Sequence, residues 1–267
     1  MPFLCRVSPL RTVNVHRYVT PLREGGSLPA IVEGDDDFLY VLKFRGAGQG
    51  VKALLAELIG GELTRAAGLK VPELVFAEVD PAFGRTEPDE EIQDLLKASA
   101  GQNLALHYLS GAITYDPAVA PVEEELASRI VWLDALLMNV DRTARNTNLL
   151  MWQKELWLID HGAALYFHHG STEFGAQAAR PFPQVKDHVL LRQASGLEVA
   201  DTELRALLTP EVVTTITAQL PTEWLQTAFP EEDAEVMRTA YSDFLNERIR
   251  HSEPFLNEAL HARAAAL

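Results

Sequence analysis

The 267-residue chain has a single cysteine, Cys5, which excludes an internal disulfide and is typical of a reducing compartment. It is also poor in positive charge, because 23 Lys and Arg stand against 38 Asp and Glu and the formal net charge is −15. Nucleic-acid binding depends on clustered Lys and Arg that displace counterions from phosphates. This composition therefore argues against a nucleic-acid partner.

Long apolar runs are missing as well. Arg6 and Arg11 interrupt the N-terminal region, which argues against a secretory signal. The most apolar segment, Ile130–Val140, is broken by Asp134 and followed by Asp141, and it falls short of the roughly 20 apolar residues that a membrane helix needs. These absences predict a soluble, cytoplasmic protein without a membrane partner.

The N-terminal part of the chain has the pattern of a small sheet with one helix. Short apolar runs predict strands at 28–33, 38–44, 71–79 and 103–108. Helical spacing of apolar residues predicts a helix over Val51–Ala67, which Gly68 would end. The acidic stretch Pro81–Ala100 is expected to be a surface loop with at most one helical turn.

The C-terminal part is predicted to be largely helical. Amphipathic or acidic runs indicate helices at 122–137, 202–208, 210–219 and 232–265. A polar loop is expected over Phe167–Gln184, and the linker Ser110-Gly111 precedes the first of these helices. The resulting fold class is α+β, with one part over residues 1–106 and a second part over residues 107–267.

The segment Val140–Gly162 carries the most informative motif. Asp141 is followed five positions later by Asn146, and a strand-like run then ends at Asp160 before Gly162. Phosphoryl transfer requires a carboxylate for the acceptor, oxygen ligands for Mg²⁺ and a cation for the nucleotide phosphates. Asp141 suits the catalytic base, and Asn146 and Asp160 suit hard-oxygen metal ligands.

Lys43, within Tyr-Val-Leu-Lys-Phe, suits the phosphate-binding cation, because a strand directs its side chain toward one face only. Each of these motifs alone has an ordinary interpretation: Asp141 as a turn cap, Lys43 as a solvated lysine, and Asp160 as the end of a strand. Their order along the chain, with a helix bearing glutamates after Lys43, is the order found in kinases.

Five segments together resemble the HipA-like kinases. They are Gly25-Gly26-Ser27, Tyr-Val-Leu-Lys-Phe, Arg-Ala-Ala-Gly-Leu-Lys-Val-Pro-Glu, Asn-Val-Asp-Arg-Thr-Ala-Arg-Asn-Thr-Asn-Leu-Leu and Leu-Ile-Asp-His-Gly. The resemblance implies a two-lobed protein-kinase-like fold, with a small N-terminal lobe of antiparallel sheet and one helix and a larger, mostly helical C-terminal lobe. It also implies use of ATP and Mg²⁺ and phosphorylation of serine or threonine in proteins.

The resemblance also implies roles for particular residues. Asp141 would be the base, Asn146 and Asp160 the metal ligands, and Lys43 the phosphate contact. Backbone groups of Gly25, Gly26 and Ser27 would cover the nucleotide phosphates, with Ser27 a candidate for self-phosphorylation. The adenine would contact backbone groups of His107, Tyr108 and Leu109.

Several points stay open at this level. Alignment to the family selects Glu57 as the partner of Lys43, whereas a helical wheel places Glu62 nearer the middle of the apolar arc; we favour Glu57.

The chain is shorter than toxin-type members, so toxin activity does not follow. The acceptor is unknown. A small-molecule or lipid-headgroup phosphotransferase, or a pseudokinase that binds nucleotide and acts through partners, is the alternative to a protein kinase.

Two features of the segment after Asp160 carry less weight. His161, His168 and His169 lack a cysteine at zinc spacing, so a zinc site is discounted and the His-His pair is expected to be solvated. Phosphorylation of Ser171 or Thr172 could order the loop against Arg180, although a mobile polar loop is the simpler interpretation.

Overall fold

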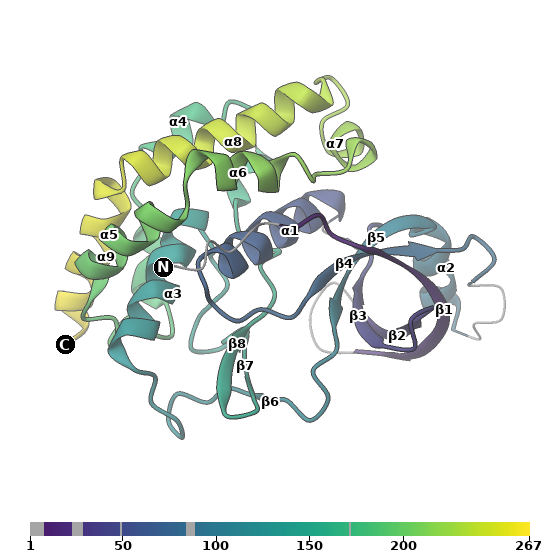
Figure 1. Ribbon diagram of the computed structural model, residues 1–267, viewed down its shortest axis with the longest axis horizontal. Helices are drawn as coiled ribbons and strands as arrows, with labels where there is room; N and C mark the ends of the chain where they lie inside the picture. Colours follow the sequence, from purple (N-terminus) through teal and green to yellow (C-terminus); the bar gives the residue numbers. More distant parts are fainter. Residues whose placement is uncertain (1–7, 23–28, 49, 84–88, 171) are drawn as a thin grey trace.

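The computed structural model describes residues 8–22, 29–48, 50–83, 89–170 and 172–267. Five strands form a closed barrel at one end of the molecule, and most helices gather at the other end, with helix α1 (Gly50–Ala66) between them (Figure 1). A small sheet of β6 (Ile113–Thr114), β7 (Leu149–Trp152) and β8 (Glu155–Leu158) lies below α1 in this view. The expected sheet-rich N-terminal part is therefore present.

The barrel has the strand order β1-β2-β3-β5-β4. The strands span Thr12–Pro21 (β1), Ala30–Gly34 (β2), Leu39–Lys43 (β3), Leu74–Val79 (β4) and Gly101–His107 (β5). The prediction of an antiparallel sheet was wrong in two respects. The strand β1 was not predicted, and it pairs with β4 in parallel orientation. Only Val13 and Val15 of β1 are buried, so the alternation of apolar and polar residues covers less than half of this strand.

Two hydrophobic cores stabilise these elements. One fills the barrel and includes Val32, Tyr40 and Leu42, which alternate along their strands with residues of the outer face. The larger core joins α1 to the C-terminal helices. Because α1 lies between the barrel and those helices, it is buried on almost every side, Glu57 and Glu62 included, and it ends before Gly68, whose φ is +73°.

The N-terminal part contains a second helix, α2 (Glu90–Ala98), so the expected surface loop at 81–100 is wrong over this span. Asp89 is the N-cap, and its carboxylate accepts hydrogen bonds from the backbone N–H groups of Glu91 and Ile92. Leu96 buries its side chain against the barrel interior. The cap and this apolar contact give the acidic segment enough stabilisation to form a helix.

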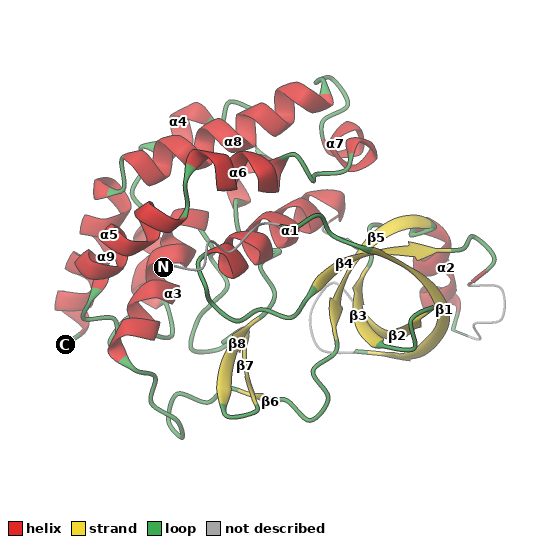
Figure 2. Ribbon diagram, in the orientation of Figure 1, coloured by secondary structure: helices red, strands yellow, loops and turns green. Residues whose placement is uncertain are grey.

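The C-terminal helices are α3 (Glu124–Leu137), α4 (Gly175–Ala178), α5 (Leu197–Leu207), α6 (Pro210–Thr217), α7 (Thr222–Ala228), α8 (Ala234–Arg250) and α9 (Glu253–Ala266) (Figure 2). The single helix predicted over 232–265 is divided into α8 and α9, because Pro254 at the start of α9 cannot continue the preceding helix. The helix α7 was not predicted. Among the residues described, no helix is both long and apolar enough to cross a membrane.

The segment 167–184 was predicted as a polar loop, and its described residues, which do not include Ser171, are anchored to the core. It contains α4 and parts of the 3₁₀ helices Tyr166–His169 and Pro183–Asp187. Phe167, Phe174 and Phe182 are buried, and these apolar contacts hold the segment in place. Of the His-His pair that was expected to be solvated, His168 is fully buried, whereas His169 is exposed.

Candidate functional site

Lys43 lies at the centre of the candidate site. Its Nζ atom is 2.6 Å from Oδ1 of Asp160 and 3.4 Å from Oε2 of Glu57. The strand β3 presents Lys43 on the face opposite to the barrel-filling residues Tyr40 and Leu42. Lys43 and Glu57 are almost fully buried, whereas 44% of the Asp160 side chain is exposed, so the carboxylate of Asp160 is open to a ligand. The three side chains line one small cavity.

The structure distinguishes the two glutamates that the sequence left open. Glu57 contacts Lys43, whereas both carboxylate oxygens of Glu62 accept hydrogen bonds from Arg65, one turn further along α1. Burial alone would favour neutral Glu57, but the charge of Lys43 lowers the pKa of Glu57 to about 2. Burial alone would lower the pKa of Lys43, but Glu57 and Asp160 raise it above its ordinary value. Lys43 and Glu57 therefore form a charged pair at neutral pH.

Asp141 lies in the loop after α3, and two amide groups orient its side chain. Its Oδ2 atom accepts hydrogen bonds from Nδ2 of Asn146 at 2.7 Å and from Nδ2 of Asn148 at 3.2 Å. Among the residues described, no donor bonds to Oδ1 of Asp141. The loop is closed by backbone hydrogen bonds from the Thr143 N–H to the carbonyls of Asp141 and Asn146.

The segments that carry Asp141 and Asp160 are joined through the backbone. The Ile159 N–H donates to the carbonyl of Asn148 at 3.0 Å, and Ile159 directly precedes Asp160. Asn148 in turn donates to Asp141, as described above. Asp160 has a φ of +56°, in the left-handed region that Asp tolerates better than most residues and that is often found at functional sites. Hydrogen bonds therefore link the loop that carries Asp141 and Asn146 to the strand end that carries Asp160.

The donor set fits a hard divalent cation such as Mg²⁺. The amide nitrogen of Asn146 is occupied by Asp141, so its amide oxygen is left for a metal, and Asp160 offers an exposed carboxylate. Oxygen ligands of this kind are the ones that Mg²⁺ takes, together with phosphates and water.

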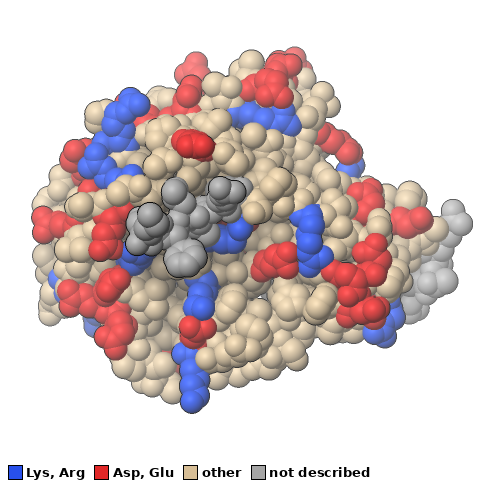
Figure 3. Space-filling model, in the orientation of Figure 1, with Lys and Arg blue, Asp and Glu red and all other residues tan. Residues whose placement is uncertain are grey.

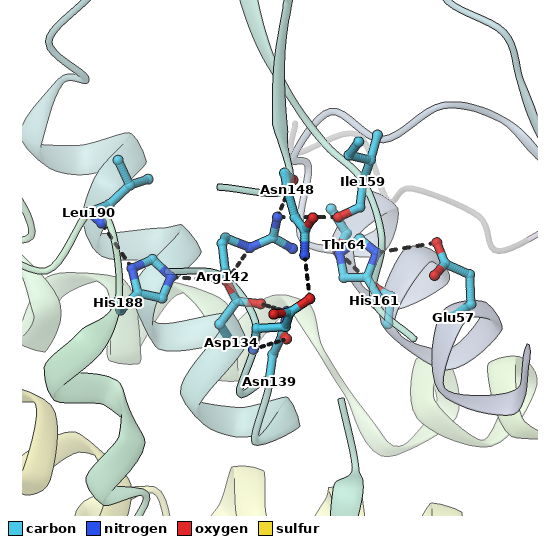
Figure 4. Close-up of polar contacts among 12 residues, drawn as sticks. Glu57, Thr64, Asp134, Asn139, Arg142, Asn148, Ile159, His161, His188 and Leu190 are labelled. Atoms are coloured by element: carbon cyan, nitrogen blue, oxygen red, sulfur yellow. Dashed lines mark hydrogen bonds and ion pairs between the residues drawn. The ribbon is translucent and has the colours of Figure 1, made fainter. Parts of the chain in front are cut away.

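Sequence reasoning missed a buried ionic cluster beneath this loop, made of Asp134, Arg142 and His188 (Figure 4). Asp134 Oδ2 lies 2.6 Å from Arg142 Nε and 3.0 Å from His188 Nε2, and all three side chains are buried. Burial would raise the pKa of Asp134, but Arg142 and then His188 hold it well below its ordinary value. A lone aspartate in the apolar run 130–140 was the signal, because a buried carboxylate needs a partner.

Arg142 links this cluster to both halves of the site. Its Nη1 atom donates to the carbonyls of Asn148 and Ile159, which precede β7 and Asp160 respectively. The segment at 188–189 is attached to the same loop, because the Val189 N–H donates to the Arg142 carbonyl. The guanidinium therefore fixes the relative position of the Asp141 loop and the strand end that carries Asp160.

Hydrogen bonds within the protein reduce the number of backbone N–H groups at 107–109 that could contact an adenine. The N–H of His107 donates to the carbonyl of Glu73, and the N–H of Tyr108 donates to the carbonyl of Leu39. Neither N–H is therefore available to a nucleotide base. Within the described part of the chain, the N–H of Leu109 bonds to no protein group, while the Leu109 carbonyl accepts from Ala112. The predicted phosphate-covering residues Gly25, Gly26 and Ser27 lie outside the described residues.

The face of the molecule shown in Figure 3 carries Lys and Arg interspersed with Asp and Glu, without a continuous basic area.

The chain was compared with known proteins and solved structures. A search of curated proteins found no match. Among solved structures, the Helicobacter pylori proinflammatory kinase CtkA superposes with a TM-score of 0.57 at 13% identity, over 97% of this chain and 99% of that one. The Golgi casein kinase superposes with a TM-score of 0.45 at 14% identity, over 98% of this chain and 74% of that one. The same kinase with Mn/ADP bound gives 0.42 at 14% identity, over 98% and 76%.

The likeness to CtkA shows a shared kinase fold across nearly the whole chain. The family model for HipA-like kinases matches residues 15–254, which confirms the resemblance read from the motifs. Family and fold together support a phosphotransferase. The protein belongs to the HipA-like kinase family.

Proposed function

We propose that the protein is a kinase that uses ATP and Mg²⁺ to phosphorylate serine or threonine in a protein acceptor. The observation that carries this proposal is the position of Lys43, between buried Glu57 and exposed Asp160. The Asp160 strand end is joined through Asn148 to the loop of Asp141. A cation for the phosphates, a carboxylate for the metal and a carboxylate for the acceptor then lie in one connected site.

Each side chain has a defined task in this proposal. Asp141, oriented by the amides of Asn146 and Asn148, accepts the proton of the acceptor hydroxyl through Oδ1. The acceptor oxygen forms its bond to the γ-phosphorus as the bond from that phosphorus to ADP breaks. Lys43 holds the phosphates, and Asp160 with the amide oxygen of Asn146 would hold Mg²⁺, which would neutralise charge on the phosphate oxygens.

The arrangement of two lobes divided near residue 106 is part of the same proposal. The barrel has an interior of its own, and the site lies where the barrel strand β3 meets α1 and the end of β8. The adenine would extend from Lys43 toward the chain that leaves β5, where the Leu109 N–H is the donor left for it within the described residues.

Labelled ATP tests the proposal. The protein is incubated with γ-labelled ATP, Mg²⁺ and either a protein lysate or a panel of metabolites. We expect label on serine or threonine of protein acceptors. Asp141→Asn should lower transfer about a hundredfold or more while ATP still raises the melting temperature. Asp160→Asn should lower both the phosphate transfer and the rise in melting temperature that ATP produces. Asp243→Asn, which replaces an exposed aspartate on α8, is the matched control.

The outcomes separate the alternatives. Label confined to small molecules would replace the protein acceptor by a metabolite or a lipid headgroup. ATP binding without transfer to any acceptor would contradict the kinase proposal and favour a nucleotide-binding pseudokinase.

A further inference from the structure

The buried ring of His161 connects α1 to the segment that carries Asp160. His161 is fully buried, and it directly follows Asp160 in the chain. Its Nε2 atom lies 3.0 Å from Oγ1 of Thr64, and its Nδ1 atom lies 3.9 Å from Oε1 of Glu57 (Figure 4). A Cβ added at Gly60 would lie only 2.6 Å from Cβ of His161, so α1 and this segment touch at a residue without a side chain.

The hydrogen bonds of the Thr64 hydroxyl determine whether Thr64 or the His161 ring donates the proton in the bond between them. The Thr64 hydroxyl is 2.7 Å from the carbonyl oxygen of Gly60, and a carbonyl cannot donate, so the hydroxyl gives its only proton there. The Oγ1 atom then has only lone pairs left for His161. The ring therefore donates from Nε2–H to Thr64, and this bond fixes the orientation in which Nδ1 faces Glu57.

Two residues from other segments of the chain, Lys43 and His161, face the carboxylate of Glu57. Its Oε2 atom binds Lys43 of β3, and its Oε1 atom faces the His161 ring and has no hydrogen-bond partner among the residues described. Rotation of the Glu57 side chain toward His161 would break the contact with Lys43. Movement of α1 away from His161 would leave the Nε2–H group buried without an acceptor, which is costly.

We propose that His161, held by Thr64, is a positioning residue that keeps Glu57 and Asp160 aligned on the two sides of Lys43, an inference that rests on the proposed function. Asp160 is covalently next to the ring, and Glu57 is in contact with it. A single hydrogen bond between Thr64 and His161 therefore couples the position of α1 to the position of the proposed metal-binding carboxylate. His161 and Thr64 themselves touch neither nucleotide nor acceptor in this proposal.

Thr64→Val and Thr64→Ser provide a matched test, because valine keeps the shape of threonine without the hydroxyl and serine keeps the hydroxyl. We expect Thr64→Val to weaken Mg-ATP binding and to lower kcat, each by about tenfold, at a temperature where the protein is fully folded. Hydrogen exchange of the backbone amides in 156–165 should become faster in Thr64→Val. Thr64→Ser should behave as the wild-type protein does in all three measurements.

A purely structural role for Thr64 predicts a different result. In that case Thr64→Val would lower the melting temperature but leave Mg-ATP affinity, kcat and amide exchange of 156–165 unchanged, and the proposal would be overturned. Gly60→Ala is the second variant, because its methyl group would displace His161 directly. Gly60→Ala should lower Mg-ATP affinity, kcat and amide protection of 156–165, as Thr64→Val does. Its control is Gly175→Ala, where an added Cβ meets nothing within 4 Å. Wild-type behaviour of folded Gly60→Ala would also overturn the proposal.

Failure of the proposed function would be recognised separately. A wild-type protein that neither binds Mg-ATP nor transfers phosphate would contradict the kinase proposal. Amide exchange would still test the coupling between α1 and the Asp160 segment, because it requires no ligand. Unchanged protection of 156–165 in both Thr64→Val and Gly60→Ala would then overturn the positioning role by itself.

Discussion

Lys43 and Asp160 form an ion pair, with Nζ of the lysine 2.6 Å from Oδ1 of the aspartate, although the two residues lie 117 positions apart in the chain. The pair joins the barrel strand β3 to the end of strand β8. Asp160 is the more exposed partner, so its carboxylate is accessible from solvent, whereas Lys43 is held against buried Glu57.

The first prediction concerns the metal dependence of nucleotide binding. Asp160→Ala should lose most of the increase in melting temperature that Mg-ATP produces, because the variant lacks the carboxylate proposed to bind the cation. The measurement is a thermal shift with ATP and Mg²⁺ compared with ATP and a chelator. Asp243→Ala is the control. A shift in Asp160→Ala equal to that of the wild type, with the same metal dependence, would show that Asp160 does not hold the metal.

The second prediction separates the two buried glutamates of α1. Glu57→Gln should weaken nucleotide binding about tenfold or more, because Lys43 loses the negative partner that holds it in the site. Glu62→Gln should alter stability through Arg65 and leave nucleotide affinity within about twofold. Titration calorimetry of both variants measures the difference. Equal affinities for the two variants would argue against a role for the Lys43–Glu57 pair.

The third prediction concerns the ionic cluster under the Asp141 loop. Arg142→Met should lower the free energy of unfolding by roughly 3–5 kcal/mol, because Asp134 stays buried after losing its guanidinium partner. The double variant Asp134→Leu with Arg142→Met should recover part of this loss, since the uncompensated charge is then absent. Urea unfolding of the wild type, of Asp134→Leu, of Arg142→Met and of the double variant measures these values. A double variant less stable than the sum of the two single changes would contradict this account of the cluster.

The fourth prediction concerns the pH dependence of stability. Burial, followed by the charges of His169 and Lys52, lowers the pKa of His168 from 6.5 to about 3. The unfolded chain then binds one more proton than the folded protein between these two pH values, so stability is fully present above pH 6.5 and is lost as pH falls toward 3. The slope is about 1.4 kcal/mol per pH unit below the unfolded pKa.

His168→Gln tests this effect by removing the ionisable ring next to Tyr241. Between pH 7.5 and 5.5, the unfolding free energy of the wild type should fall by about 1 kcal/mol more than that of the variant. His251→Gln, at an exposed position on the end of α8, is the matched control and should follow the wild type. Parallel curves for the wild type and His168→Gln would contradict the role assigned to burial.

The sequence was a good guide to some elements and a poor guide to others, for local physical reasons. The helix α1 was predicted within one residue at each end, because its apolar spacing is regular and Gly68 follows it. The helix α2 was missed because its stability depends on the Asp89 cap and on packing of Leu96 against the barrel. The strand β1 was missed because its pairing with β2 and β4 compensates for a weak alternation pattern.

The sequence by itself determined the chemical groups of the site and their order, because the spacing from Asp141 to Asn146 and the strand that ends at Asp160 are local patterns. Only the tertiary structure decided which groups meet. Both Glu57 and Glu62 are buried, and the position of α1 in the folded protein decides which of them contacts Lys43. The contacts of His188 with Asp134 and of His161 with Thr64 join segments that the chain brings together only when its core forms, so no local pattern specifies these partners.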